Sequence, residues 1–148
     1  MPDAIYWDTS ALLKLYAPEP DSEHFRDLLR EQTDAIAISF LHRIELNFAL
    51  FAKEQRGEIS SGSAKRLFDS FHQHRAEGRF LEIPWGDDVA RHAGNALDLS
   101  AQSEFPVLLR SIDGIHLGAM LAAGIRKLIT TDIRLRNASV HLGLEVIS

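Results

Sequence analysis

The amino-acid sequence predicts an α/β fold with three layers, in which a mostly parallel sheet of four or five strands lies between helices. Short apolar runs alternate along the chain with longer segments of helical periodicity, which is the pattern of strand–helix–strand units. The runs are mostly apolar, as expected of strands that are buried on both faces. The 148 residues contain no internal repeat and no linker rich in Pro, Gly or Ser, so we expect one domain over residues 1–148.

The expected strands are five short apolar runs, each about the length of a buried strand. They cover residues 4–7, 35–38, 80–83, 128–131 and 144–147. In an open parallel sheet the ligand site lies beyond the carboxyl ends of the strands. Residues that directly follow these runs are therefore the first candidates for chemistry.

The expected helices lie between these runs, where apolar residues recur every three or four positions and so share one helix face. Phe25 and Leu28 show this spacing early in the chain, and Leu67 and Phe71 show it near the middle. The helices expected from this pattern cover residues 11–16, 22–32, 40–56, 63–79, 88–102 and 111–125, with a short one within 133–142.

The composition excludes several kinds of chemistry. The chain has no cysteine, which excludes disulfides, zinc–thiolate sites, iron–sulfur clusters and thiol nucleophiles. Its apolar stretches are interrupted by charged residues or His well before the ~18 residues that a bilayer span needs. Residues 1–20 carry Asp3, Asp8 and Glu19 and no basic segment before an apolar run. We therefore expect a cytoplasmic protein without an export signal.

The net charge of −5, from 16 basic and 21 acidic residues, taken alone argues against nucleic acid as a partner, because phosphate binding usually leaves a basic surface. This objection holds only if the acidic residues are spread evenly. Carboxylates gathered around a divalent cation would raise the acidic count and still form a site that attracts phosphate.

Two expected strands are each followed by an aspartate that precedes a helix. Asp8 follows the first run, and Asp132 follows the run at 128–131. Each could instead be a helix N-cap, a position that Asp favours, although Thr9 and Ser10 could also cap the first helix. If the two strands are neighbours in the sheet, both carboxylates meet at one edge.

Asp113 is one of two polar side chains in the otherwise apolar stretch 112–125, the other being His116. A helix that is apolar on nearly all sides is buried, and a carboxylate there is costly unless it is paired or coordinated. The alternative is a first-turn carboxylate with Ser111 as cap or Arg110 as ion-pair partner. We expect His116 to be a hydrogen-bonded core residue that supports the site and not a metal ligand.

Glu45 lies on the flank of the apolar stripe of its expected helix, whereas a surface Glu would lie opposite that stripe. It could alternatively be a boundary residue paired with Arg43 or His42. Four carboxylates brought together at one sheet edge raise one another's pKa unless a cation compensates them. A hard divalent ion such as Mg²⁺ or Mn²⁺ suits such oxygen ligands.

Four segments now show a family resemblance: WDTSALLKLY, HRIEL, LLRSIDGIHLGAML and LITTDIRL. In this order they resemble the PIN-domain ribonucleases, and most of all the VapC-type toxins of toxin–antitoxin pairs. One departure is Gly at 114 and 118, where Ala is more usual; these glycines could loosen the helix or let another backbone approach closely.

The resemblance implies a PIN-like fold and a metal-dependent endoribonuclease that leaves a 5′-phosphate and a 3′-hydroxyl. Asp8 and Asp113 would be the leading metal ligands, Asp132 would complete the set, and Glu45 would bind the metal directly or through water or orient the attacking water. Ser10 and Thr131 would support the ligands through hydrogen bonds. Candidates for positioning the RNA phosphates, each near a site motif but each also able to be a solvated surface charge, are Lys14, Arg43, Arg110, Arg134 and Arg136.

Five of the eight phenylalanines fall in two consecutive expected helices, namely Phe40, Phe48, Phe51, Phe68 and Phe71. Part of this surface is expected to receive another chain, because large exposed apolar patches mark interfaces; otherwise the rings complete the core. The resemblance implies a VapB-like antitoxin as that partner, and a homodimer. Two alternatives stay open within the family: a housekeeping RNA-processing nuclease and a catalytically silent PIN-like module. A phosphohydrolase of the haloacid dehalogenase type is disfavoured, because Ser10 stands where that class requires an aspartate.

Overall fold

The structure is a computed structural model that describes residues 3–148. Its centre is a sheet of five strands in the order β3-β2-β1-β4-β5, and every neighbouring pair is parallel. The strands are β1 (Ala4–Trp7), β2 (Ala35–Ser39), β3 (Phe80–Ile83), β4 (Lys127–Ile129) and β5 (Glu145–Val146). The expected parallel α/β fold is confirmed, and β1 is its middle strand.

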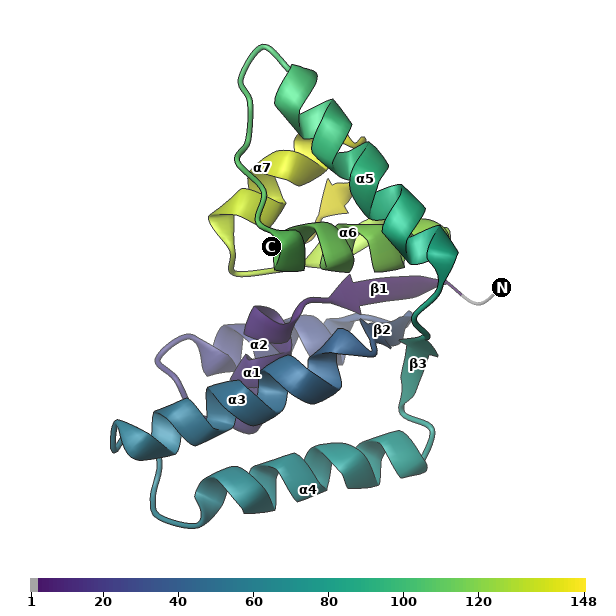
Figure 1. The fold of residues 1–148 in the computed structure, drawn as a ribbon. Helices are drawn as coiled ribbons and strands as arrows, with labels where there is room; N and C mark the ends of the chain where they lie inside the picture. Colours follow the sequence, from purple (N-terminus) through teal and green to yellow (C-terminus); the bar gives the residue numbers. More distant parts are fainter. Residues whose placement is uncertain (1–2) are drawn as a thin grey trace.

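Helices cover both faces of the sheet, as Figure 1 shows: α5, α6 and α7 lie on one face, and α1 to α4 lie on the other. Their bounds are α1 (Thr9–Tyr16), α2 (Ser22–Glu31), α3 (Leu41–Gln55), α4 (Ser63–Ala76), α5 (Asp87–Gln102), α6 (Ser111–Ala122) and α7 (Ile133–His141). Each expected helix is present, and most boundaries differ by one to three residues. No helix in the described part of the chain is both long and apolar enough to cross a bilayer.

Two hydrophobic cores form because successive side chains of a strand point to opposite faces. In β1, Tyr6 joins the core beneath α5, α6 and α7, which also contains Leu117 and Leu128. Its neighbours Ile5 and Trp7 join the core on the side of α1 to α4. The apolar run that predicted this strand is therefore buried on both faces.

Three boundaries differ from the prediction for identifiable reasons. Strand β4 ends at Ile129 and not at residue 131, because the chain turns there and the Thr130 hydroxyl donates to Asp8. Helix α6 ends at Ala122 and not at residue 125; Gly124 follows with φ of 72°, a left-handed conformation that ends helices. Helix α1 begins at Thr9, earlier than expected, because Asp8 caps it.

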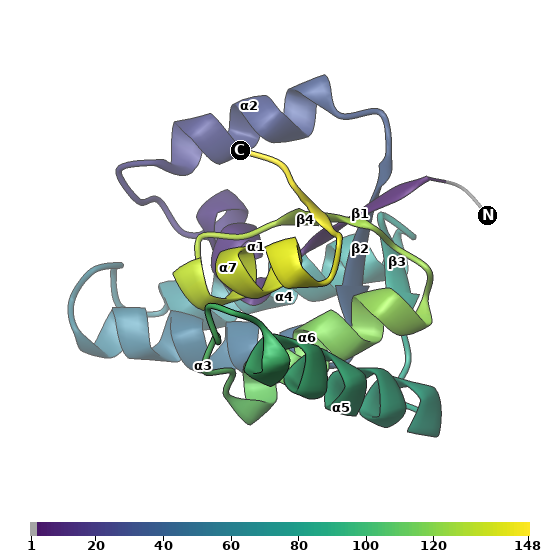
Figure 2. The same cartoon turned by 90° about the horizontal axis from the view of Figure 1, so that it is seen from above.

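Helices α5 and α6 pack against each other, and Figure 1 shows that they do so at an angle; Figure 2 gives the view from above. Gly118 makes this close approach possible. A Cβ atom added at Gly118 would lie 2.5 Å from the Val89 carbonyl oxygen and 2.8 Å from the Ala93 nitrogen. At Gly114 the nearest heavy atom would be 3.8 Å away, so only the glycine at 118 is needed for the contact.

Candidate active site

Asp8 stands at the carboxyl end of the middle strand and is buried. Its Oδ1 accepts from the Ala11 backbone N–H at 2.9 Å and so caps α1. The Ser10 hydroxyl donates to both carboxylate oxygens, at 2.7 and 2.9 Å. Burial raises the pKa of Asp8 in spite of the opposing effects of His116 and these hydrogen bonds. The carboxylate is therefore both an N-cap and a buried charge that a cation would stabilise.

Asp132 is joined to Asp8 through Thr130, because β1 and β4 are neighbouring strands. The Thr130 hydroxyl donates to Asp8 Oδ2 at 2.5 Å and accepts from the Asp132 backbone N–H at 2.9 Å. Asp132 Oδ1 caps α7 by accepting from the Arg134 N–H at 2.8 Å. Thr131, expected in a supporting role, reaches the site through its backbone N–H, which donates to Ser10 Oγ at 3.2 Å. Nothing in the sequence pattern singled out Thr130.

Asp113 is buried in the first turn of α6. Its Oδ2 accepts from the Arg110 backbone N–H at 3.0 Å and from Arg110 Nε at 3.3 Å. Arg110 Nη2 lies 3.5 Å from Asp113 Oδ1 and 3.4 Å from Asp132 Oδ2. The ion pair considered for Asp113 is therefore present, and the same guanidinium also reaches Asp132. The carboxylate of Asp113 raises the pKa of Arg110, with a smaller effect from Asp132.

Glu45 points from α3 toward the middle of the sheet edge and pairs with neither Arg43 nor His42, the partners considered from the sequence. Its Oε1 accepts from the Thr9 hydroxyl at 2.8 Å and lies 2.5 Å from His116 Nε2. Burial opposes ionisation of Glu45, but the contacts with His116 and Thr9 outweigh it, so the pKa of this carboxyl lies below its ordinary value.

Behind Glu45 lies a buried polar cluster of Tyr6, Ser39, His42 and His116. The Tyr6 hydroxyl lies 2.6 Å from His116 Nδ1 and donates to Ser39 Oγ at 3.1 Å. His42 Nδ1 accepts from the Ser39 N–H at 3.0 Å, so Nε2 carries the proton that bonds the Trp7 carbonyl oxygen at 2.6 Å. Burial, assisted by His116, lowers the pKa of His42 to about 3.

The chemistry of these side chains fits a hard divalent ion. All four acids offer carboxylate oxygens, and Asp8 has an ionised form that burial disfavours. Within residues 3–148, however, no three Asp, Glu or His side chains lie close enough together to form a ready-made metal site. At the pair Asp113 and Asp132 the guanidinium of Arg110 supplies the positive charge.

The five basic candidates differ in what they contact. Lys14 forms ion pairs with Glu19 and Asp21, both at 2.7 Å, so it stabilises the start of α2. Arg110 is paired as described above. Arg136 donates to the Thr130 carbonyl oxygen at 3.4 Å, and Arg43 and Arg134 are exposed. Arg134 and Arg136 thus flank the sheet edge on the side of α7.

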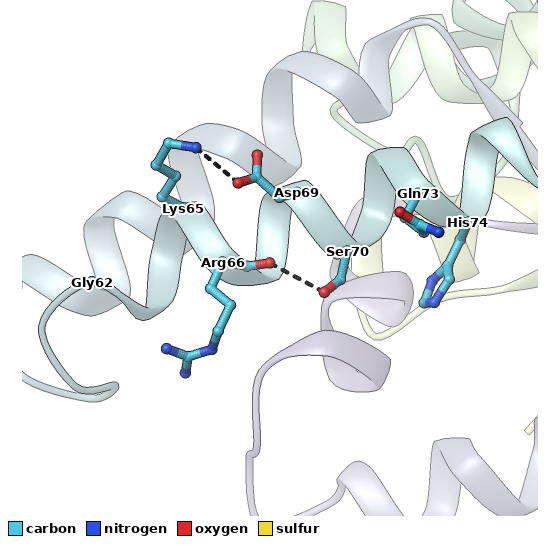
Figure 3. Close-up of a pocket in the computed structure, with 7 residues that line it drawn as sticks. All are labelled: Gly62, Lys65, Arg66, Asp69, Ser70, Gln73 and His74. Atoms are coloured by element: carbon cyan, nitrogen blue, oxygen red, sulfur yellow. Dashed lines mark hydrogen bonds and ion pairs between the residues drawn. The ribbon is translucent and has the colours of Figure 1, made fainter.

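A hollow of about 530 Å³ lies along α4 (Figure 3). Its walls include the Lys65–Asp69 ion pair of 2.8 Å, and its lining residues are Gly62, Lys65, Arg66, Asp69, Ser70, Gln73 and His74. None of the four acids contributes to it, so it plays no part in the candidate active site.

The aromatic rings of α3 and α4 divide between core and surface. Phe71 is fully buried, and Phe40 and Phe68 are partly buried. Phe48 and Phe51 are exposed by 72% and 58%, and Ile44 beside them is also exposed. These three side chains, named here the α3 apolar face, are the part of the expected surface that the core leaves uncovered.

Known proteins resemble this chain both in sequence and in fold. The PIN domain family matches residues 5–140. Ribonuclease VapC46 of Mycobacterium tuberculosis is 33% identical over 147 residues, which are 98% of this chain and 97% of that protein. VapBC2 of Rickettsia felis, solved bound to a DNA fragment from its promoter, has a chain with a TM-score of 0.66 at 16% identity, over 97% of both chains. VapC20 of Mycobacterium tuberculosis, a toxin that cleaves the sarcin–ricin loop, has a TM-score of 0.63 at 14% identity, over 90% of this chain and 94% of that chain.

Proposed function

Because this chain belongs to the PIN-domain family, we propose that it is a Mg²⁺-dependent endoribonuclease toxin of the VapC type, which a cognate antitoxin inhibits. Four acids carry the proposal. Asp8 and Asp132 are linked by Thr130, Asp132 and Asp113 are linked by Arg110, and Glu45 reaches the same edge through Thr9. These contacts join residues far apart in the chain at the carboxyl ends of β1 and β4, where open sheets bind ligands.

In this proposal Asp8, Asp113 and Asp132 would hold Mg²⁺, or Mn²⁺ in its place. Bound Mg²⁺ would lower the pKa of its water and neutralise charge on the phosphate in the transition state. Glu45, held by Thr9 and His116, would bind the ion directly or through water, or would orient the attacking water. Attack by water on phosphorus gives a 5′-phosphate and a 3′-hydroxyl, so a 2′,3′-cyclic phosphate product would contradict this mechanism.

The RNA phosphates would be held by basic side chains at the same edge. Arg134 and Arg136 flank it from α7, Arg43 is exposed on α3, and Arg110 lies between two of the acids. Lys14 is already neutralised by two carboxylates, so its contribution would be the smallest. A locally basic rim explains how a chain of net charge −5 can bind a polyanion.

We further propose that the partner is a small VapB-like antitoxin and that the protein forms a homodimer. A toxin–antitoxin complex from Klebsiella pneumoniae contains a chain of the same fold. The α3 apolar face offers exposed aromatic area next to the helix that carries Glu45, and a partner chain would cover it.

The first experiment measures RNA cleavage by highly purified protein with Mg²⁺ or Mn²⁺ and with a chelator. We expect Asp8→Asn and Asp113→Asn each to abolish metal-dependent cleavage while the protein stays folded. Asp98→Asn is the matched control, because Asp98 is exposed on α5 and, among the described residues, forms no hydrogen bond or ion pair with the four acids or their partners. Undiminished cleavage by both site variants would remove the assigned site.

A second experiment separates a toxin from a housekeeping nuclease. Expression of the chain without its antitoxin should arrest growth, and the Asp8→Asn and Asp113→Asn substitutions should relieve the arrest. Growth arrest that persists in both variants would point to a different mode of action, and active enzyme without any arrest would favour RNA processing.

A further inference from the structure

One positive group lies between two of the four acids. The guanidinium of Arg110 contacts Asp113 at 3.3 Å through Nε and Asp132 at 3.4 Å through Nη2. Asp113 comes from the first turn of α6, and Asp132 caps α7. A single side chain therefore ties together two carboxylates that are 19 positions apart in sequence (132 − 113).

The two carboxylates need this positive charge because they repel each other when both are ionised. A divalent ion that binds Asp113 and Asp132 would meet the same need with twice the charge and shorter contacts. It cannot bind the oxygens that face Arg110 while the guanidinium remains between them, because the two cations would occupy the same space and repel each other.

Arg110 is the partner that is free to move. Its side chain is 60% exposed, whereas that of Asp113 is 3% exposed. Both acids are also fixed by the backbone: Asp113 Oδ2 accepts from the Arg110 N–H at 3.0 Å, and Asp132 Oδ1 accepts from the Arg134 N–H at 2.8 Å. If the guanidinium swings out, these bonds keep both carboxylates where they are.

We infer that Arg110 holds the place of the divalent ion in the metal-free protein and competes with it for Asp113 and Asp132. This inference rests on the proposed metal site. Metal binding then releases the guanidinium to solvent at the rim of the site, where a bidentate contact with an RNA phosphate becomes open to it. The metal ion replaces the Arg110 guanidinium as the positive charge between the two carboxylates, and the released guanidinium can then bind the substrate.

The test is Mn²⁺ binding without RNA, measured by calorimetry or by the loss of the free-ion electron paramagnetic resonance signal. We expect Arg110→Ala and Arg110→Gln to bind Mn²⁺ at least about fivefold more tightly than the unmodified protein, the lower end of ordinary coupling between two ligands. Arg134→Ala is the matched control. It removes the same charge from the same edge, but its side chain contacts none of the four acids among the described residues, so its Kd should change less than twofold.

A second measurement needs no variant. In the ¹⁵N-labelled protein, the Nε–H resonance of Arg110 should shift and exchange faster with water when diamagnetic Mg²⁺ is added, and the Arg134 resonance should not. If Mn²⁺ binds equally well to the Arg110 variants, or if the Arg110 resonance is unaffected by saturating Mg²⁺, the competition is wrong while the metal site stands. If no form of the protein binds Mn²⁺, the proposed function fails as well.

Discussion

His116 Nε2 lies 2.5 Å from Glu45 Oε1, although the two residues are 71 positions apart in sequence. Because an ionised carboxylate can only accept, the ring nitrogen carries the proton of this bond. On its other side the ring contacts the buried Tyr6 hydroxyl at 2.6 Å. The direction of the Glu45 carboxylate is therefore fixed by a buried histidine and not by solvent.

Removal of this support should lower activity without loss of the fold. We expect His116→Ala to reduce kcat for RNA cleavage by about 10–100-fold, the usual effect of losing a residue that orients a ligand, with a smaller change in KM. His116→Gln, which can still donate to Glu45, should recover part of the loss. The control His92→Ala removes an imidazole of α5 that forms no hydrogen bond with any of the four acids among the described residues. An unchanged kcat in His116→Ala would show that Glu45 needs no such support.

The close contact of α5 and α6 predicts opposite effects for two glycines of one helix. Gly118→Ala should destabilise the protein by about 1–3 kcal/mol, because its Cβ would overlap the α5 backbone. Gly114→Ala has room and should stabilise by up to about 1 kcal/mol, the difference in helix propensity. The free energy of unfolding of both variants, measured by urea denaturation, tests this prediction. Equal stability of the two would mean that α5 can shift away at little cost.

The neutral, buried His42 predicts a loss of stability in acid. Its pKa is about 3 in the folded protein and about 6.5 in the unfolded chain. At pH values between these two pKa values, His42 binds a proton in the unfolded chain but not in the folded protein. The free energy of unfolding therefore has its full value above pH 6.5 and decreases as the pH falls below it. The loss is about 1.4 kcal/mol per pH unit, or about 2 kcal/mol at pH 5.

The measurement is urea unfolding at several pH values, compared between the protein and His42→Gln. The variant cannot take up this proton, so its curve of stability against pH should be flatter below pH 6.5. The comparison with the variant is needed because Asp8, with its raised pKa, acts in the opposite direction. Parallel curves would show that His42 does not stay neutral.

Asp8→Asn should make the metal-free protein more stable at neutral pH. Burial raises the pKa of Asp8, so the folded protein carries an ionised group that it disfavours, and an amide removes that charge. As the pH falls toward the raised pKa, the unmodified carboxyl takes up a proton and the difference should shrink. Thermal unfolding in a chelator tests this, and added Mn²⁺ should stabilise the unmodified protein and Asp98→Asn but not Asp8→Asn. A less stable variant at pH 7 would contradict it.

The sequence is informative about the fold because its strands are buried on both faces. Residues 4–7 and 80–83 are strands with the predicted bounds, since an uninterrupted apolar run is what a strand between two helical layers requires. The strand expected at 128–131 ends two residues earlier than predicted. A β-branched residue such as Thr130 is common in strands, so the sequence does not show that its hydroxyl bonds the Asp8 carboxylate instead.

The sequence pointed to the acids of the candidate site but not to the hydrogen bonds and ion pairs that connect them. Strand ends and a carboxylate in an apolar helix pointed to Asp8, Asp132 and Asp113. The residues that connect them depend on how elements distant in sequence meet, as with Arg110 and Asp132, which are 22 positions apart. His116 did stand out, as a polar residue on a buried face, yet the sequence contains nothing that pairs it with Glu45 across the sheet edge.

The pairing of β4 with β1 has a consequence for the synthesis of the protein. The strand order inserts residues from late in the chain beside the strand made first. On a translating ribosome, Asp8 emerges long before Asp132, and β4 cannot join the sheet until the chain between them has been released. An incomplete polypeptide thus lacks the assembled acids, so the candidate site can form only once nearly the whole chain has left the ribosome.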